Sequence, residues 1–169
     1  MAPYRGDKGF AIRFGIGWDA HPFVEGRRLI LGGVEVPHHC GLGGHSDADV
    51  LCHAVADALL GALALGDIGT LFPDTDPRYE GARSLDLLRE VARRVREEGG
   101  EPINIDAVII AQEPRLAPYV PEMRRNLAQV VGLPEGAVSV KPKRPEGLGA
   151  LGRGEGISAL AIASVRVSL

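Results

Sequence analysis

Residues 44–61, GHSDADVLCHAVADALLG, constrain the fold more than any other segment of the chain. Apolar residues recur there in pairs at every helical turn, which predicts a helix with one buried face. The pairs are Val50/Leu51, Ala54/Val55, Ala58/Leu59 and Ala62/Leu63. We expect Ser46 to cap the N-terminus of this helix, with Asp49 three residues later as in a capping box. The spacing of four then aligns Asp49, His53 and Asp57 in one polar stripe.

Strands and further helices are predicted for the remainder of the chain. In the first strand, apolar side chains alternate at Ile12, Phe14, Ile16 and Trp18. The patterns predict strands at residues 11–21, 103–112, 137–141 and 157–169, a hairpin at 28–36, a turn-rich connection at 66–77, and helices at 84–100 and 120–132. This mixture predicts an α/β fold of the α+β type, with a mixed β-sheet and helices packed on one side.

Size and charge limit the classes of protein to which the chain can belong. Its 169 residues suffice for one domain, which we place at residues 12–169, after a flexible N-terminal extension at 1–11. The net charge of −3 argues against a nucleic-acid partner, and no apolar run is long enough to span a membrane. The start lacks the apolar region of a secretory signal, and Cys40 and Cys52 make no disulfide framework. We therefore expect a cytoplasmic protein.

A metal site is predicted where the first strand meets the long helix. Asp19 and His21 are two residues apart, so they share one face of an extended strand, while Trp18 and Ala20 point the other way. If the strand packs on the helix, both can converge with His53. Two imidazoles and one carboxylate form the ligand set of a catalytic zinc ion with one open position. We expect Asp57 or a backbone carbonyl to hold the far ring nitrogen of His53.

Two other interpretations of these polar residues stay open. In the first, Asp19, His21 and His53 are ordinary exposed polar residues, or His53 is a hydrogen-bonded histidine of the core. His38, His39 and Cys40 form a rival ligand set. We rank that set below the first, because adjacent residues do not easily converge on one ion.

Phosphate binding is predicted at two places. His45, Ser46 and the first amides of the long helix form a natural anion site, although Asp47 and Asp49 repel a phosphate that is not neutralised. The glycine-rich segment at 141–156 carries four cations that suit a diphosphate. They are Lys141, Lys143, Arg144 and Arg153. The alternatives for this segment are solvated surface charge or a flexible linker.

Three segments together resemble the 2-C-methyl-D-erythritol 2,4-cyclodiphosphate synthase family. They are RFGIGWDAHPF, HSDADVLCHAVADALLGALALGDIGTLFPDTDP and GRGEGI, and the similarity runs from about residue 12 to the end of the chain. The resemblance implies a lyase of the non-mevalonate isoprenoid pathway. Such an enzyme converts 4-diphosphocytidyl-2-C-methyl-D-erythritol 2-phosphate to the cyclic diphosphate and releases CMP. It also implies a homotrimer with active sites between neighbouring subunits.

The resemblance assigns roles to residues at matching positions. It implies zinc ligands at Asp19, His21 and His53, a catalytic His45 that stabilises the transition state, and a second divalent ion, Mg²⁺ or Mn²⁺, at Glu146. The implied contacts at the methylerythritol end are Asp19, Ala20, His21, His45, Ser46, Asp67, Ile68, Gly69, Phe72, Pro73, Asp74, Thr75 and Asp76. The implied contacts with cytidine diphosphate are Ala111, Gln112, Glu113, Pro114, Arg115, Leu116, Ala117, Lys143, Arg144, Pro145 and Glu146. Ala150, Arg153 and Glu155 are implied at a central channel, which in some members holds an isoprenoid diphosphate, with Ala150 and Arg153 also touching ligand.

The last loop departs from the family pattern. Lys143 and Arg144 stand where the family has two small hydroxyl residues, and Ala150 replaces a phenylalanine. We hypothesise that Arg144 takes over the stabilisation of a phosphate as a charged donor, and that Ala150 enlarges or abolishes the isoprenoid site. The alternative functions are a zinc-dependent phosphoesterase, or an inactive relative that binds a nucleotide or an isoprenoid diphosphate.

Overall fold

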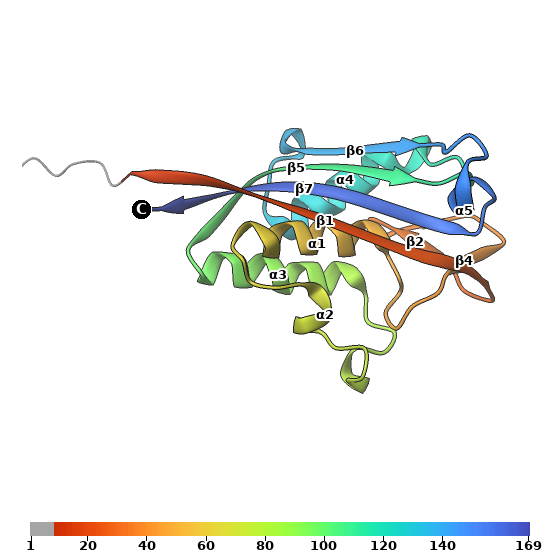
Figure 1. The fold of residues 1–169 in the computed structure, drawn as a ribbon, viewed down its shortest axis with the longest axis horizontal. Coiled ribbons are helices and arrows are strands. Elements are labelled where there is room, and N and C mark those ends of the chain that lie inside the picture. Colours follow the sequence, from red (N-terminus) through yellow and green to blue (C-terminus); the bar gives the residue numbers. More distant parts are fainter. Residues whose placement is uncertain (1–8) are drawn as a thin grey trace, which may run out of the picture.

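The computed structural model describes residues 9–169 and contains one mixed sheet of five strands, in the order β4-β1-β7-β5-β6 (Figure 1). The strands are β1 (Phe10–Glu25), β4 (Cys40–Leu42), β5 (Gly100–Ile110), β6 (Val138–Lys143) and β7 (Gly156–Ser168). The β5–β6 pair is parallel and the other pairs are antiparallel. The predicted mixed sheet is confirmed. Residues 1–8 of the expected extension lie outside the described residues, and Phe10 and Ala11 already belong to β1.

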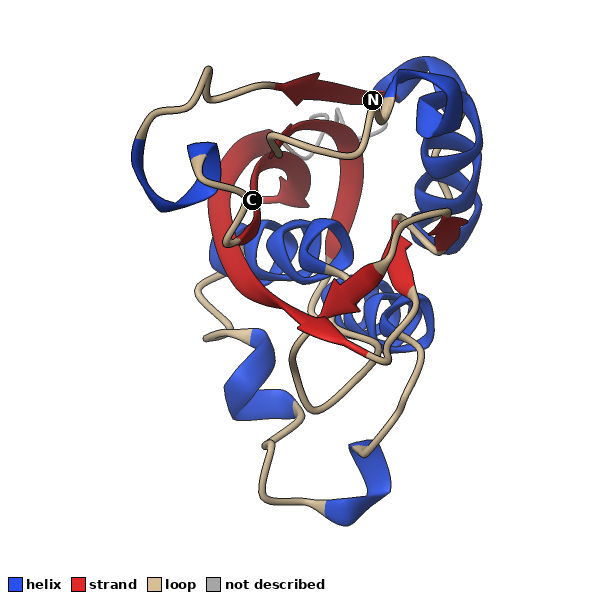
Figure 2. Ribbon diagram, turned by 90° about the vertical axis from the view of Figure 1, so that its right-hand side faces the viewer, coloured by secondary structure: helices blue, strands red, loops and turns tan. Residues whose placement is uncertain are grey.

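Helices cover one side of this sheet, as expected (Figure 2). They are α1 (Val50–Ala62), α2 (Ile68–Leu71), α3 (Ser84–Glu97), α4 (Val120–Val131) and α5 (Gly149–Gly152). Helix α1 packs on β1 and β7, α3 packs on α1, and α4 packs on α3 and β6. The predicted hairpin is β2 (Leu29–Leu31) with β3 (Val34–Val36). Within residues 9–169, the helices are all too short or too polar to cross a membrane.

Helix α1 rests directly on the backbone of β1. A Cβ atom added at Gly17 would lie 2.0 Å from the carbonyl oxygen of Ala54, and one added at Gly15 would lie 2.0 Å from that of Ala58. No side chain fits at either position, because real Cβ atoms essentially never come that close to another heavy atom. The two glycines therefore let the helix approach the strand more closely than side chains normally allow.

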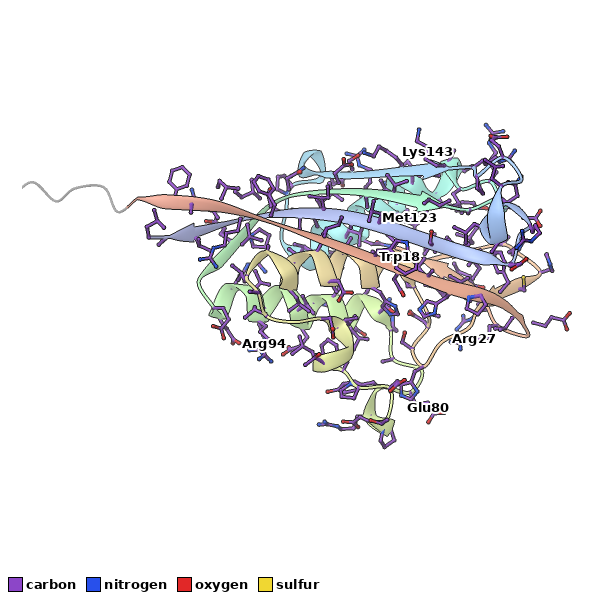
Figure 3. The ribbon with its side chains drawn as sticks, in the orientation of Figure 1. Trp18, Arg27, Glu80, Arg94, Met123 and Lys143 are labelled. Atoms are coloured by element: carbon purple, nitrogen blue, oxygen red, sulfur yellow. The ribbon has the colours of Figure 1, made fainter. Side chains whose placement is uncertain are left out.

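The opposite face of β1 is apolar and exposed. We call it the apolar sheet face and define it by Phe10, Ile12, Phe14, Ile16, Trp18 and Ile162. Trp18 is 62% exposed and Phe14 is 69% exposed (Figure 3). The alternation that predicted the strand is thus real, but these large side chains lie outside the core. Gly15 and Gly17 occupy the inward positions next to Phe14, Ile16 and Trp18.

Helix α1 begins later than the sequence suggested. It starts at Val50, and its N-cap is Asp49 rather than Ser46. The Asp49 carboxylate is fully buried and accepts hydrogen bonds from the amides of Leu51 and Cys52, each at 3.1 Å, and from the amide of Gly33 at 2.8 Å. Burial raises the pKa of Asp49. The expected polar stripe is therefore confined to His53 and Asp57, which line one cavity, because Asp49 turns inward. The expected anion site loses the amides of Leu51 and Cys52, which Asp49 occupies.

Candidate active site

Asp19, His21 and His53 meet as the sequence predicts. The Oδ2 atom of Asp19 lies 2.8 Å from Nδ1 of His53 and 3.1 Å from Nε2 of His21, and the two ring nitrogens are 3.4 Å apart. Nitrogen and oxygen ligands of a tetrahedral zinc ion are roughly 3.3–3.6 Å apart, given bond lengths of about 2.0–2.2 Å. The three atoms thus form a triangle of nearly the right size for one face of a metal site.

The Asp19 carboxylate and the imidazole of His53 shift each other's pKa values. Burial alone would raise the pKa of Asp19, but hydrogen bonds to His21 and His53 outweigh it and hold the pKa below the ordinary value. Burial likewise acts to lower the pKa of His53, and the hydrogen bond to Asp19 outweighs it, so that this pKa is raised. A carboxylate that stays ionised beside two imidazoles attracts a cation strongly.

The far nitrogen of His53 is held by hydroxyl groups, and not by Asp57 as expected. Its Nε2 lies 2.9 Å from Oγ of Ser84 and 3.2 Å from Oγ of Ser46. The Ser84 hydroxyl in turn donates to Asp47, which also accepts from the Ser84 amide at 3.1 Å. This chain of contacts fixes the orientation of the His53 ring.

Asp57 supports a neighbouring element. Its carboxylate accepts a hydrogen bond from the amide of Ile68 at 2.8 Å, which ties α2 to the side of α1. Asp67 caps α2 through the amide of Thr70 at 2.7 Å. These two bonds hold the start of α2 beside the metal ligands.

A cavity of 460 Å³ opens in front of the triad. It is lined by Asp19, His21, Gly44, His45, Ser46, His53, Asp57, Ile68, Gly69, Phe72, Asp74, Tyr79 and Leu87. Ala20, Asp67, Pro73, Thr75 and Asp76 were also expected to contact substrate, and they do not line it. The cavity therefore joins the triad to the predicted phosphate contacts His45 and Ser46.

The loop that carries His45 and Ser46 is held from outside the cavity. Arg27 donates to the carbonyl oxygens of Gly44, at 2.5 Å, and of Ser46 (Figure 3). Nε2 of His45 lies 3.3 Å from the carbonyl oxygen of Asp76. These contacts fix the loop on both sides.

A second, smaller cavity of 170 Å³ lies beside the ends of β5 and β6. It is lined by Ala111, Pro114, Arg115, Leu116, Ala117, Pro142, Lys143 and Arg144. Gln112, Glu113, Pro145 and Glu146 were expected there as well and do not line it, although Oε1 of Gln112 accepts from the Gly147 amide at 3.2 Å. Strands β7 and β5 separate β1 from β6, so the two cavities lie on opposite sides of the sheet centre.

The residues implied at a central channel lie outside both cavities. Arg153 and Glu155 form an exposed ion pair, with Nε of Arg153 2.6 Å from Oε1 of Glu155. Ala150 lies in α5 and is exposed.

Some site residues were missed by the sequence interpretation. Ser84 was read only as the start of an amphipathic helix, and nothing local reveals that the fold brings it to His53. Gly44, Tyr79, Leu87 and Pro142 line the cavities without having been named. For Gly44, adjacency to His45 was an available signal. The rival set converges more than the sequence argument expected, because the ligand atoms of His38, His39 and Cys40 lie within 4.8 Å of one another.

Comparisons with known proteins all point to one family. A model of the YgbB family matches residues 12–166. The chain is 60% identical over 158 residues to the 2-C-methyl-D-erythritol 2,4-cyclodiphosphate synthase of Alkaliphilus metalliredigens, across 94% of this chain and 99% of that protein. The bifunctional IspDF of Campylobacter jejuni matches with a TM-score of 0.90 and 43% identity, over 94% of this chain and 43% of that one. A 2C-methyl-D-erythritol-2,4-cyclodiphosphate synthase in a CDP-bound form matches with a TM-score of 0.83 and 39% identity, over 90% and 99%.

Proposed function

This chain belongs to the YgbB family, and from that membership we infer that it converts 4-diphosphocytidyl-2-C-methyl-D-erythritol 2-phosphate to 2-C-methyl-D-erythritol 2,4-cyclodiphosphate with release of CMP. It is a phosphorus–oxygen lyase of the non-mevalonate isoprenoid pathway. The observation that carries this function is the triangle of Asp19, His21 and His53 in the wall of a cavity that His45 and Ser46 also line.

The reaction forms one phosphorus–oxygen bond and breaks another. An oxygen of the 2-phosphate attacks the diphosphate phosphorus that bears methylerythritol, and CMP leaves with the electron pair of the broken bond. The attacking oxygen is already anionic at neutral pH, so the site needs no general base. The barrier is mostly repulsion between phosphates and their misalignment, and the protein lowers it by positioning and by charge.

We propose that the metal held by Asp19, His21 and His53 is zinc, because two imidazoles and a carboxylate are a zinc ligand set. Bound there, it supplies positive charge that offsets the repulsion between the phosphates. His45 and Ser46 hold phosphate oxygens in the same cavity, and His45 stabilises the transition state. Ile68, Gly69, Phe72 and Asp74 line the remaining wall. The other expected contacts at this end stay as proposals: Ala20, Asp67, Pro73, Thr75 and Asp76.

We propose that the smaller cavity binds the cytidine diphosphate part of the substrate. Its apolar wall at Ala111 and Leu116 suits a base, and Lys143 and Arg144 bring two positive charges to the diphosphate. Glu146, near the end of the same loop, is proposed to help hold Mg²⁺ or Mn²⁺. Gln112, Glu113 and Pro145 complete the proposed contacts.

We propose a homotrimer in which one subunit supplies the metal cavity and its neighbour the base cavity. Two observations support it. The two cavities share no lining residue, and the apolar sheet face leaves large side chains exposed. Arg153, Glu155 and Ala150 are then proposed at a central channel. The single domain at 12–169 and a cytoplasmic location, supported by the free thiols Cys40 and Cys52, complete the proposal.

The function is tested by incubating zinc-loaded protein with the cytidyl substrate and Mg²⁺ and analysing the products by mass. We expect the cyclic diphosphate and one equivalent of CMP. Hydrolysis products would instead identify a phosphoesterase, and unchanged substrate with zinc-loaded protein would identify a binding protein without this activity.

The role of Arg144 has its own test. If Arg144 stabilises a phosphate in the transition state, Arg144→Ala lowers kcat by roughly 100-fold, the effect typical of losing one such donor. Arg115→Ala removes a cation from the same cavity and serves as the matched control. An unchanged kcat in Arg144→Ala would show that the loop only binds.

The channel proposal concerns Ala150. If Ala150 enlarges or abolishes the isoprenoid site, an added isoprenoid diphosphate raises the melting temperature of the Ala150→Phe variant more than that of the unmodified protein. Equal shifts in the two proteins would contradict the proposal.

A further inference from the structure

His38, His39 and Cys40 form a second group of metal-ligating side chains, apart from the triad. They follow β3 and enter β4, and the chain bends at His39. That bend brings the His38 and His39 rings to 4.3 Å between centroids, although the two residues are adjacent. None of the three lines either cavity, so the group belongs to neither proposed substrate site.

We propose that His38, His39 and Cys40 bind a second metal ion of the zinc class through two imidazoles and one thiolate. Their ligand atoms lie within 4.8 Å of one another. A tetrahedral zinc ion with nitrogen and sulfur ligands needs separations of roughly 3.4–3.6 Å. Rotation of the exposed His39 side chain brings its ring nitrogen toward the other two ligand atoms.

The surroundings of the group favour a cation. Cys40 pairs with Glu25 in the β1–β4 register, and Glu25 and Glu113 both act electrostatically on its thiol. A cation bound beside Cys40 is attracted by both carboxylates.

The ligand set also selects the kind of metal. Imidazole and thiolate suit zinc, whereas magnesium and calcium prefer oxygen ligands. Glu113, on another segment, is one of the carboxylates whose charge acts on both His38 and Cys40. It lies within the 111–117 segment, five of whose residues line the smaller cavity.

Cobalt distinguishes the two metal sites by their spectra. The triad has no sulfur, so a thiolate-to-cobalt charge-transfer band in the near ultraviolet reports on a cysteine ligand alone. We would titrate the metal-free, reduced protein with Co²⁺ and follow both stoichiometry and spectrum. The expected result is two equivalents per chain and a charge-transfer band that accompanies one of them.

Variants assign that band to this site. Cys40→Ser removes the band and one equivalent of bound cobalt. His39→Ala, at an exposed position, lowers the affinity of the same site for cobalt at least tenfold. Cys52→Ala is the matched control, because it removes the other thiol of the chain and leaves both equivalents in place. Circular dichroism confirms that each variant is folded. A single equivalent without the band, or a band that survives Cys40→Ser, would overturn the proposal, whether or not the chain makes the cyclic diphosphate.

Discussion

On the face of β1 turned toward α1, Gly15 and Gly17 carry no side chains and Asp19 and His21 carry metal ligands, whereas on the other face Ile16 and Trp18 are large and exposed. The first face has no space left, because the helix backbone lies against it. The second has no covering within residues 9–169. The difference teaches that the two faces of one strand can serve separate tasks: the inner face sets the geometry of the site, and the outer face is the one that we propose for association.

Gly17→Ala should have the largest effect, because it disrupts the packing of α1 on the inner face of β1. Its Cβ would meet the carbonyl oxygen of Ala54 at 2.0 Å, and neither backbone can yield without moving α1. We expect a loss of more than about 4 kcal/mol in the free energy of unfolding, measured by chemical denaturation. Gly136→Ala is the control, since an added Cβ there meets nothing within 4 Å. Equal stability of the two variants would refute the close contact of helix and strand.

His53→Ala should remove the function of the inner face and leave its packing. His53 supplies one of the three ligands, so we expect loss of the bound metal from the triad and a fall in kcat of at least about 100-fold. The unfolding transition should stay cooperative. Metal analysis and steady-state kinetics measure both effects. A variant that keeps its metal and its kcat would show that His53 is not a ligand.

Ile16→Asp should act on the outer face alone. Ile16 is 65% exposed, so within one chain the change should cost no more than about 0.5 kcal/mol of unfolding free energy. A buried charge in an apolar interface would nevertheless disrupt the proposed trimer. Analytical ultracentrifugation should find trimers for the original protein and monomers for the variant. If the original protein is also a monomer, the outer face does not form a trimer interface.

Ser84→Ala should have the smallest effect of the four substitutions, a modest loss of metal affinity on the inner face. The Ser84 hydroxyl lies 2.9 Å from Nε2 of His53 and only orients the ring, so metal affinity should fall about tenfold. Ser158→Ala is a matched control. The Ser158 hydroxyl is buried without a hydrogen-bond partner among residues 9–169, and its loss should leave affinity unchanged. Competition with a chelator measures both affinities, and equal values would remove Ser84 from the site.

The sequence allowed the prediction of most of the fold and of the triad, for identifiable reasons. Asp19 and His21 share a face because strands alternate, and the apolar pairs of α1 predict that it packs on a sheet. The start of α1 was misplaced because Asp49 competes with Ser46 as a cap, and only the contact of Asp49 with the hairpin decides between them. The partner of His53 was missed because Ser84 is distant in sequence.

The cluster at 38–40 shows a different limit. Adjacent side chains on a regular strand point to opposite faces, so the sequence argument against His38, His39 and Cys40 was sound for an extended chain. Because the chain bends at His39, residues 38–40 are not extended, and the argument does not apply to them. A local change of backbone direction of this kind is set by the packing of the hairpin and β4, and the residue letters alone do not reveal it.

The contact at Gly15 and Gly17 also bears on how such a chain can evolve. His53 reaches Asp19 because α1 lies at the shortest distance from β1 that two backbones permit. A methyl group on either glycine would lift the helix and open the triangle of ligand atoms. Two residues without side chains, which touch neither metal nor substrate, are therefore as necessary to the geometry of the site as the ligands themselves.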